Sequence, residues 1–279
     1  MDKLIIGCGY LGRRVAKRWL ADGNRVFALT RSTENAELLR TLGVEPILGD
    51  VLDTQTLHSL PAVETMLYAV GFDRQAAASK RDVYVSGLRN VLEVVASRVN
   101  KIIYVSSTSV YGQSNGESVS ETSPTEPTTE GGCICRDAEN ILNELAGDSA
   151  MCLRLAGIYG PQRLLARLDS IRSGQPFRGC GDAWLNLIHV DDAVKTVEQC
   201  RENWQPGETV NVGDDRPITR SEFYTTLAAL VNAPKPKFEG GDGLNKRIDN
   251  SKLHTLGVTL DFPSIDEGLP NSLEGIDTA

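Results

Sequence analysis

The chain has 279 residues, of which 41% are hydrophobic, 24% charged and 6% aromatic. These values are close to those of an average globular protein, so they exclude disorder, a collagen-like chain and a coiled coil for the chain as a whole. The 37 acidic and 29 basic residues give a formal net charge of −8, which argues against nucleic acid or an anionic membrane as the main partner, because positive charge drives binding to phosphate.

The start of the chain and its cysteines predict a cytoplasmic protein. Met1-Asp2-Lys3 lead directly into the apolar run Leu4–Ile6, which is too short and too early for a signal peptide. No run of about 18 apolar residues, as a membrane span needs, follows it. The six cysteines are scattered, so we expect reduced thiols. No cluster of Cys or His completes a set of zinc ligands, and we predict no metal site.

Short runs rich in β-branched residues alternate with amphipathic segments in the first part of the chain. The candidate strands are Lys3–Ile6, Arg25–Thr30, Glu45–Leu48, Thr65–Val70, Lys101–Ser106 and Met151–Ala156. Between them, the segment 84–95 has apolar residues on one face of a helix. Strand and helix repeated in this way predict a Rossmann-type α/β fold, a doubly wound parallel sheet with helices on both faces.

Beyond Pro161 the alternation loosens, and we predict a small C-terminal substrate lobe. We expect a helix at 162–173, strands at 187–189 and 209–212, and a helix that begins near Asp191 and Asp192, where two carboxylates suit the positive end of a helix. The predicted division is a dinucleotide-binding domain of residues 1–159 and a lobe of residues 160–279, of which 186–213 return to the core. The polar segment 112–132 is predicted to be a long loop, and such loops are usually functional or mobile.

The glycine motif Gly7-Cys8-Gly9-Tyr10-Leu11-Gly12 follows the first predicted strand directly and opens a helix. In this strand-turn-helix context, G-x-G-x-x-G is typical of a dinucleotide-binding site. Gly7 allows the tight turn, Gly9 lets the backbone approach a pyrophosphate, and Gly12 lets helix and strand pack closely. We predict that this turn and the following helix N-terminus bind the cofactor pyrophosphate; the alternative is a glycine-rich turn without a ligand.

The end of the second predicted strand indicates which dinucleotide is preferred. In NAD-binding units a carboxylate about 20 residues after the glycine motif binds the ribose 2′-hydroxyl. Here that region holds Arg31, 19 residues after Gly12, followed by Ser32. A cation and a hydroxyl suit a 2′-phosphate, so we predict NADP, with NAD as the less favoured cofactor. The alternative is that Arg31 is an ordinary exposed cation.

Further motifs follow the glycine motif in the order in which they occur in a known protein family, and together they cover about residues 3–270. They are Gly49-Asp50-Val51, Lys101–Ser107 with Thr108–Gly112, Leu153–Pro161, Leu187–Ala193 and Val210–Gly213. In these motifs the chain resembles the extended short-chain dehydrogenase/reductases, the NAD-dependent epimerase/dehydratase superfamily.

The resemblance implies roles for individual residues. Asp50, with Val51, matches the adenine-contacting acid of the family, and Ser107 matches its catalytic hydroxyl. The residues Ala69, Val70 and Gly71, at the end of the fourth predicted strand, are expected to line the same crevice.

The resemblance also implies a Tyr-x-x-x-Lys pair about 25 residues after Ser107, in which the tyrosine is the acid/base and the lysine lowers its pKa and holds the ribose. The matching segment Glu130–Glu139 contains neither residue, and none of the seven tyrosines has a lysine four positions on. Tyr84 also stands where the family has a structural asparagine. The chain therefore looks like an atypical branch of the superfamily.

Several residues are candidate substitutes for the missing acid/base, each with a structural alternative. Tyr111 follows the predicted catalytic serine by four residues and is a candidate acid/base or a wall of the substrate pocket. Cys133 and Cys135 are candidate thiol acids or helix-packing residues. Arg136 holds phosphate or ribose, or is an exposed cation, and His189 is an acid/base or part of a structural turn.

We therefore predict an NADP-binding oxidoreductase or epimerase-like enzyme that transfers a hydride to a small polar substrate, with nucleotide sugars among the candidates. Ser107 and Tyr111 are its predicted catalytic residues. The alternatives are a catalytically silent NADP(H)-binding regulatory protein and a structural protein with a vestigial site. The predicted partner is a small molecule, and formation of a homodimer is left open, because many relatives pair through two helices.

Overall fold

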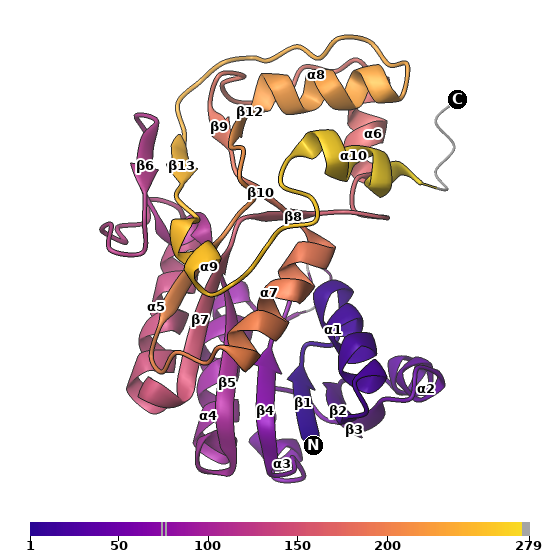
Figure 1. Ribbon diagram of the computed structural model, residues 1–279, viewed down its shortest axis with the longest axis vertical. Coiled ribbons are helices and arrows are strands. Elements are labelled where there is room, and N and C mark those ends of the chain that lie inside the picture. The colour runs from indigo at the N-terminus through magenta and orange to yellow at the C-terminus, as the bar shows by residue number, and fades with distance from the viewer. Residues whose placement is uncertain (74, 76, 275–279) are drawn as a thin grey trace. The chain divides into compact units, whose positions relative to one another are not determined.

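The computed structural model describes residues 1–73, 75 and 77–274 (Figure 1). Its internal contacts divide the chain into two compact units. The first consists of Met1–Val110, Pro127–Arg154 and Val194–Val210, and the second of Tyr111–Glu126, Leu155–Ala193 and the chain from Asn211 onward. The chain therefore passes back and forth between the units, and neither unit is a single continuous segment.

A seven-stranded sheet carries most of the first unit, in the strand order β11-β7-β5-β4-β1-β2-β3. Its strands are β1 (Asp2–Ile6), β2 (Arg25–Thr30), β3 (Glu45–Leu48), β4 (Val63–Tyr68), β5 (Val99–Ser107), β7 (Ala150–Leu155) and β11 (Thr209–Val212). The pairs β1–β2, β2–β3, β1–β4 and β4–β5 are parallel. The strand order reverses between β1 and β4, which confirms the predicted doubly wound fold and marks the point where such sheets bind ligands.

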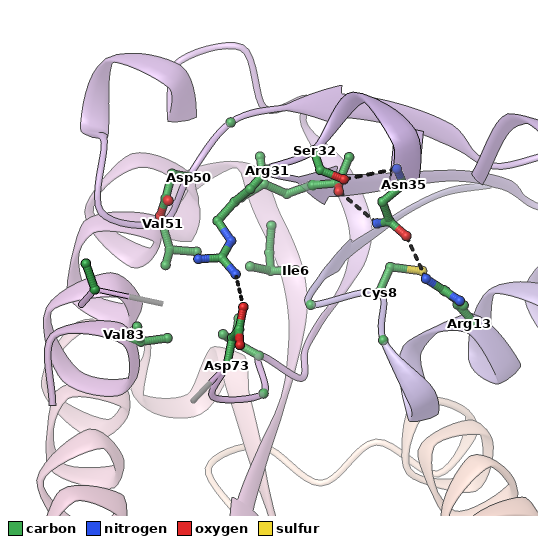
Figure 2. Close-up of a pocket in the computed structure, with 18 residues that line it drawn as sticks. Ile6, Cys8, Arg13, Arg31, Ser32, Asn35, Asp50, Val51, Asp73 and Val83 are labelled. Carbon is green, nitrogen blue, oxygen red and sulfur yellow. Dashed lines mark hydrogen bonds and ion pairs between the residues drawn. The ribbon is translucent and has the colours of Figure 1, made fainter. Parts of the chain in front are cut away.

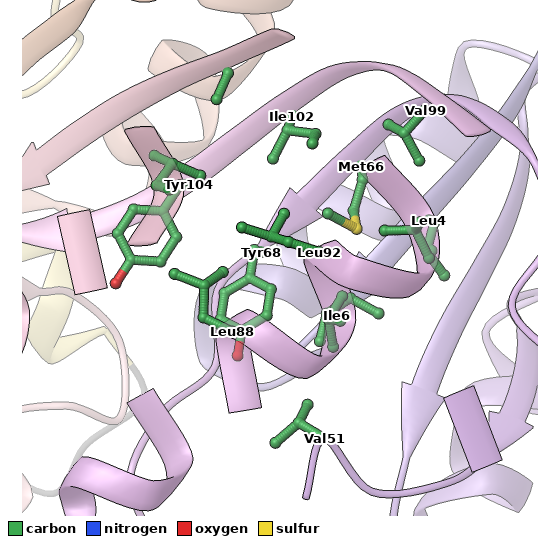
Figure 3. Packing of buried hydrophobic residues seen from close by; sticks show 14 of the residues in the cluster. Leu4, Ile6, Val51, Met66, Tyr68, Leu88, Leu92, Val99, Ile102 and Tyr104 are labelled. Atoms are coloured by element: carbon green, nitrogen blue, oxygen red, sulfur yellow. The ribbon is translucent and has the colours of Figure 1, made fainter. Parts of the chain in front are cut away.

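The helices that accompany these strands are α1 (Tyr10–Ala21), α2 (Thr33–Thr41), α3 (Thr54–Leu57), α4 (Gly87–Val95), α5 (Glu130–Leu145) and α7 (Val190–Glu202). A short π-helical turn, η1 (Asp82–Ser86), leads into α4. The predicted apolar face of this segment places Leu88 and Leu92 against Leu4, Ile6 and Met66 of the sheet (Figure 3). All five side chains are completely buried, and burial of each such side chain is worth roughly 1.5–3 kcal/mol.

A buried ion pair fastens α5 to the sheet. The carboxylate of Glu139 on α5 accepts hydrogen bonds from Nε and Nη2 of Arg154 on β7, at 3.0 and 2.7 Å. It also accepts one from the hydroxyl of Ser106 on β5, at 2.6 Å. All three residues are 7% exposed. Because a buried charge that loses its partner is costly, this contact fixes which face of α5 meets the end of β5.

Most predicted elements agree with the structure, and several differ from it at one end. The strands β2, β3, β10 and β11 have the predicted bounds. The fourth strand ends at Tyr68 rather than at Val70: the N–H of Ala69 still donates to the carbonyl of Ile6, at 2.8 Å, but Ala69 and Val70 are not part of the strand. The helix predicted at 162–173 is shorter, Leu165–Arg172.

The second unit contains short elements: β6 (Glu117–Val119), β8 (Gly157–Tyr159), α6 (Leu165–Arg172), β9 (Trp184–Leu185), β10 (Leu187–His189), β12 (Ile218–Thr219), α8 (Arg220–Leu230), β13 (Lys246–Ile248), α9 (Ser251–Thr255) and α10 (Ile265–Leu273). The segment predicted as a loop at 112–132 contains β6, which pairs in parallel with β13. That partner lies far along the chain, so no local signal marks the strand. No helix in the described part of the chain is long and apolar enough to cross a membrane.

Candidate functional site

A cavity of about 820 Å³ opens at the carboxyl ends of β1, β2, β3 and β4 in the first unit (Figure 2). Eight of the predicted cofactor residues line it: Gly7, Gly9, Arg31, Ser32, Asp50, Val51, Val70 and Gly71. The other four do not line it: Tyr10, Leu11 and Gly12 begin α1, and Ala69 directly follows β4. Residues from four separate segments of the chain therefore meet at one cavity, on the side of the sheet where the strand order reverses.

The three positions of the motif differ in why a glycine suits them. Gly7 has φ +92°, and a β-carbon there would lie 2.5 Å from the carbonyl oxygen of Ala69. A β-carbon at Gly12 would lie 2.6 Å from the carbonyl oxygen of Gly7. At Gly9, which lines the cavity, a β-carbon would meet no heavy atom within 4 Å. The outer glycines are needed for packing, whereas the middle one leaves open space where a bound pyrophosphate needs it.

The start of α1 adds electrostatic attraction to this space. No side chain caps the helix N-terminus, and its first turn contains no acidic residue. The unpaired N–H groups of that turn and the partial positive charge of the helix dipole thus remain available to an anion. The residues present therefore fit the pyrophosphate of a dinucleotide.

A polar network at the end of β2 includes residues that sequence reasoning did not select. Nη2 of Arg13 donates to Oδ1 of Asn35 at 2.6 Å, and Nδ2 of Asn35 donates to the hydroxyl of Thr30 at 2.8 Å (Figure 2). The N–H of Asn35 donates to Oγ of Ser32 at 3.0 Å. Nε of Arg13 is buried and has no hydrogen-bond partner within the described residues. Arg13 directly follows Gly12, and its place in the first turn of α1 was the signal available to find it.

Arg31, the second arginine at the end of β2, is more exposed than Arg13. Arg31 extends from the end of β2 toward Asp73, with Nη2 3.6 Å from Oδ2 of the carboxylate (Figure 2). The two side chains are 53% and 52% exposed, and an ion pair between exposed groups is worth only about 0–1 kcal/mol. The guanidinium group is therefore available to a stronger anionic ligand.

Cys8 lines the same cavity, between the first two glycines. Burial raises the pKa of its thiol to about 11, although the charge of Arg13 acts in the opposite direction. The side chain is thus a neutral thiol at physiological pH. No group of three or more Cys, His, Asp or Glu residues among those the structure describes is arranged to hold a metal ion.

The predicted catalytic serine lies at the end of β5. Ser107 is half-buried and does not line the cavity, and its hydroxyl accepts a hydrogen bond from the N–H of Ser109 at 3.1 Å. The face of α5 that meets this strand end carries Gly131, Cys135 and Glu139, spaced four residues apart. A Tyr-x-x-x-Lys pair facing β5 would therefore occupy positions 131 and 135, which hold a glycine and a cysteine.

Cys135 is buried beneath this strand end. Burial raises the pKa of its thiol, while a hydrogen bond from Ser109 and the charge of Lys80 act in the opposite direction. The thiol thus stays protonated, and it lies within electrostatic range of a lysine from another segment.

The remaining candidates make local packing contacts. Sγ of Cys133 donates to the carbonyl of Pro127 at 3.4 Å, and Arg136 pairs with the neighbouring Asp137 at 3.3 Å. In the second unit, the fully buried Tyr111 donates its hydroxyl hydrogen to Oδ1 of Asn211 at 2.8 Å. His189 is also fully buried, and its ring centroid lies 5.2 Å from that of Tyr159. These contacts are those expected of packed side chains.

The profile of the NAD dependent epimerase/dehydratase family matches residues 4–213. Protein YeeZ of Escherichia coli (strain K12) is 28% identical over 268 residues, which cover 93% of this chain and 95% of the relative. A solved structure of a putative NAD-dependent epimerase/dehydratase from Methylobacillus flagellatus is 31% identical, with a TM-score of 0.82 and coverage of 99% and 98% of the two chains.

A more distant structure, MoeE5 in complex with UDP-glucose and NAD, is 21% identical, with a TM-score of 0.78 and coverage of 98% of each chain. At that identity the likeness shows the fold alone.

Proposed function

Because the chain belongs to the NAD dependent epimerase/dehydratase family, we propose that it is an NADP-dependent oxidoreductase that transfers a hydride to or from a small polar substrate. The observation that carries the proposal is the cavity in which the open face of Gly9 and the uncapped start of α1 lie near Arg13 and Arg31. Two cations and an anion-binding helix end in one cavity suit a ligand with both a pyrophosphate and a separate phosphate group.

Each part of this cavity has a role in the proposal. The N–H groups of α1 bind the pyrophosphate, Arg31 and Ser32 bind the 2′-phosphate, and Asp50 with Val51 contacts the adenosine. The cofactor, when bound, supplies or accepts the hydride at its nicotinamide ring. Ser107 hydrogen-bonds the substrate oxygen and orients it for the transfer. Since MoeE5 has been solved with UDP-glucose, nucleotide sugars are the first substrate class to test.

The cofactor is tested by titrating the protein with NADPH and NADH and following nicotinamide fluorescence. We expect NADPH to bind at least about ten-fold more tightly, which corresponds to about 1.4 kcal/mol. Tighter binding of NADH would contradict the assignment of the 2′-phosphate to Arg31 and Ser32.

The reaction is tested with Ser107→Ala. We expect this variant to lower the rate of NADPH oxidation in the presence of keto-sugar nucleotides and simple diketones, and to leave NADPH affinity nearly unchanged. An unchanged rate would remove Ser107 from the mechanism.

A second candidate function follows from positions 131 and 135, which carry no tyrosine and no lysine. It is a protein that binds NADP(H) and reports its state to a partner without turnover. Stoichiometric NADPH binding with no oxidation of NADPH by any of the carbonyl compounds would favour it over the enzyme.

A further inference from the structure

The dinucleotide crevice of a doubly wound sheet extends across the point where the strand order reverses. Under the proposed function, one half of such a ligand lies in the lined cavity, over the ends of β1, β2 and β3 and beside Val70, Gly71 and Asp73, which follow β4. The other half then lies over the carboxyl ends of β4 and β5. The groups at that end come from the segment that leads into η1, from the turn after β5 and from the first turns of α5.

Two consecutive glycines at the start of α5 have different surroundings. A β-carbon on Gly132 would lie 2.3 Å from the carbonyl oxygen of Ser109, so the packing of α5 against the turn after β5 excludes any side chain there. A β-carbon on Gly131 would meet a single heavy atom outside its own helix, Nζ of Lys80, at 2.9 Å. Gly131 has no left-handed backbone conformation, so the backbone itself does not require a glycine. The missing side chain leaves room for the ammonium group of Lys80.

Lys80 is half-buried and is held by contacts other than ion pairs. Its Nζ lies 5.3 Å from the centroid of the Tyr84 ring, which favours a cation over the ring face. Within the described ranges of the chain, no carboxylate lies within 4 Å of it. Its charge also acts on Cys135, one helical turn beyond Gly131. Lys80 therefore lies along the face of α5 where the acid/base pair of the family is absent.

Tyr84, four residues after Lys80, has a different role. Burial raises the pKa of its hydroxyl, although a hydrogen bond from the backbone of Phe72 opposes this. The tyrosine thus stays protonated and forms a wall against which the lysine side chain lies.

We propose that Lys80 supplies the acid/base that α5 lacks, with its ammonium group in contact with the oxygen of the substrate that is reduced. This assignment rests on the proposed function. In the reducing direction the substrate carbonyl carbon takes a hydride from the reduced nicotinamide, and its oxygen takes a proton from Nζ of Lys80. The products are an alcohol and the oxidised cofactor, and the neutral amine then takes a proton from water. In the oxidising direction the amine takes the hydroxyl proton.

The position of Lys80 is tested by limited acetylation with acetic anhydride and mass spectrometry of the lysine-containing peptides. NADPH, which spans both halves of the crevice, is expected to slow acetylation of Lys80 at least about ten-fold. In contrast, 2′,5′-ADP, which fills only the adenosine half, is expected to leave it unchanged. Lys17, an exposed lysine of α1, is the internal control. NADPH binding without protection of Lys80 overturns this assignment alone, whereas absence of NADPH binding overturns the proposed function as well.

The chemical role is tested by two substitutions at Lys80 with one control. Lys80→Met is expected to lower turnover about 10²- to 10⁴-fold, the usual contribution of a general acid/base. Lys80→Arg keeps the charge but does not release a proton, so it is expected to retain NADPH affinity within about three-fold of wild type without restoring turnover. Arg81→Met removes an exposed cation that pairs with Asp137 and is expected to change neither. Full turnover by Lys80→Met would overturn the role, as would a wild-type protein inactive toward every carbonyl probe.

Gly131→Ala separates the role of Lys80 from the stability of the fold. Alanine suits a helix at least as well as glycine, so thermal stability is expected to be unchanged or higher. Its β-carbon displaces Nζ of Lys80, and we expect turnover to fall at least about ten-fold, together with loss of the NADPH protection of Lys80. Wild-type turnover and protection in a folded Gly131→Ala protein would contradict the proposal.

Discussion

The two ends of the dinucleotide crevice are built in opposite ways. At the β1–β2 end, the glycine turn, the start of α1 and the network around Arg13 and Asn35 all come from one short stretch of sequence, residues 7–35. At the β4–β5 end, Lys80, Ser107 and Gly131 come from three separate segments that only the fold brings together. The difference teaches that a binding motif carried by contiguous residues can persist while the chemistry at the other end is supplied by different side chains.

The largest effect is expected at the buried ion pair of Glu139 with Arg154. It tests whether the structure of the β4–β5 end depends on this pair rather than on the reactive groups there. Glu139→Ala removes the carboxylate that neutralises the buried guanidinium of Arg154, which is expected to lower the free energy of unfolding by about 3–5 kcal/mol. Urea denaturation measures it. The double variant Glu139→Leu with Arg154→Met is expected to recover much of the loss, and a loss below about 1 kcal/mol in the single variant would show that α5 is held elsewhere.

At the β1–β2 end, substitutions of the first and second glycines of the motif are expected to affect different properties, stability in one case and NADPH binding in the other. Gly7→Ala introduces a left-handed residue and a contact of 2.5 Å with the backbone of Ala69, so the free energy of unfolding is expected to fall by about 2–4 kcal/mol. Gly9→Ala projects into open space and is expected to cost less than about 1 kcal/mol of stability. It is expected to weaken NADPH binding at least about ten-fold.

Thermal unfolding and NADPH titration of both variants distinguish these outcomes. Unchanged NADPH affinity in Gly9→Ala would mean that the open face is not where the pyrophosphate lies.

A smaller effect is expected at Arg31. Removing a charge-assisted contact to a phosphate costs about 1.5–3 kcal/mol, so Arg31→Ala is expected to weaken NADPH binding about 10- to 150-fold. NADH affinity is expected to stay within about three-fold, because NADH lacks the 2′-phosphate. Equal losses for both dinucleotides in fluorescence titrations would place Arg31 at a group that they share.

The last effect concerns Asp214 of the second unit, which is not among the residues that line the cavity. Asp214 is 4% exposed, and Oδ2 has no hydrogen-bond partner among residues 1–73, 75 and 77–274. Burial raises the pKa of this carboxyl from its ordinary value of 3.8 to about 8, and the charges of Asp215 and Asp192 act in the same direction. The N–H and the charge of Arg216 oppose the shift.

Because the folded state keeps a proton that the unfolded chain releases, the contribution of Asp214 to the free energy of unfolding falls as pH rises from about 4 to about 8. Asp214→Asn removes this titration. Its Tm is expected to exceed that of wild type by at least about 2 °C at pH 8 and to approach wild type near pH 4, as measured by scanning fluorimetry. A pH-independent difference would show that the carboxyl is ionised in the folded protein.

The sequence was sufficient to predict the sheet, because its strands are short apolar runs whose local composition differs from that of the helices between them. It also predicted the glycine turn and the Arg31–Ser32 end of the cavity, since these residues have fixed spacings within one strand-helix-strand unit. Arg13 and Asn35 were missed, because hydrogen bonding between α1 and α2 depends on how the two helices start.

Lys80 was missed for a stronger reason. Its relation to Gly131 is set by the packing of α5, which in turn depends on Glu139 and Arg154. No spacing rule connects these positions. The strand β6 escaped prediction for a similar reason, because its partner β13 is remote in sequence.

The anchor of α5 has a consequence for how this scaffold changes over evolution and in the laboratory. Glu139, Arg154 and Ser106 hold the middle of the helix through hydrogen bonds that involve neither position 131 nor position 135, while Gly132 packs against the turn after β5. Exchanges at positions 131 and 135 therefore leave this anchor in place. A single framework of this kind can host more than one set of reactive side chains, and it offers a designer a fixed platform on which a new active site can be installed at positions 131 and 135.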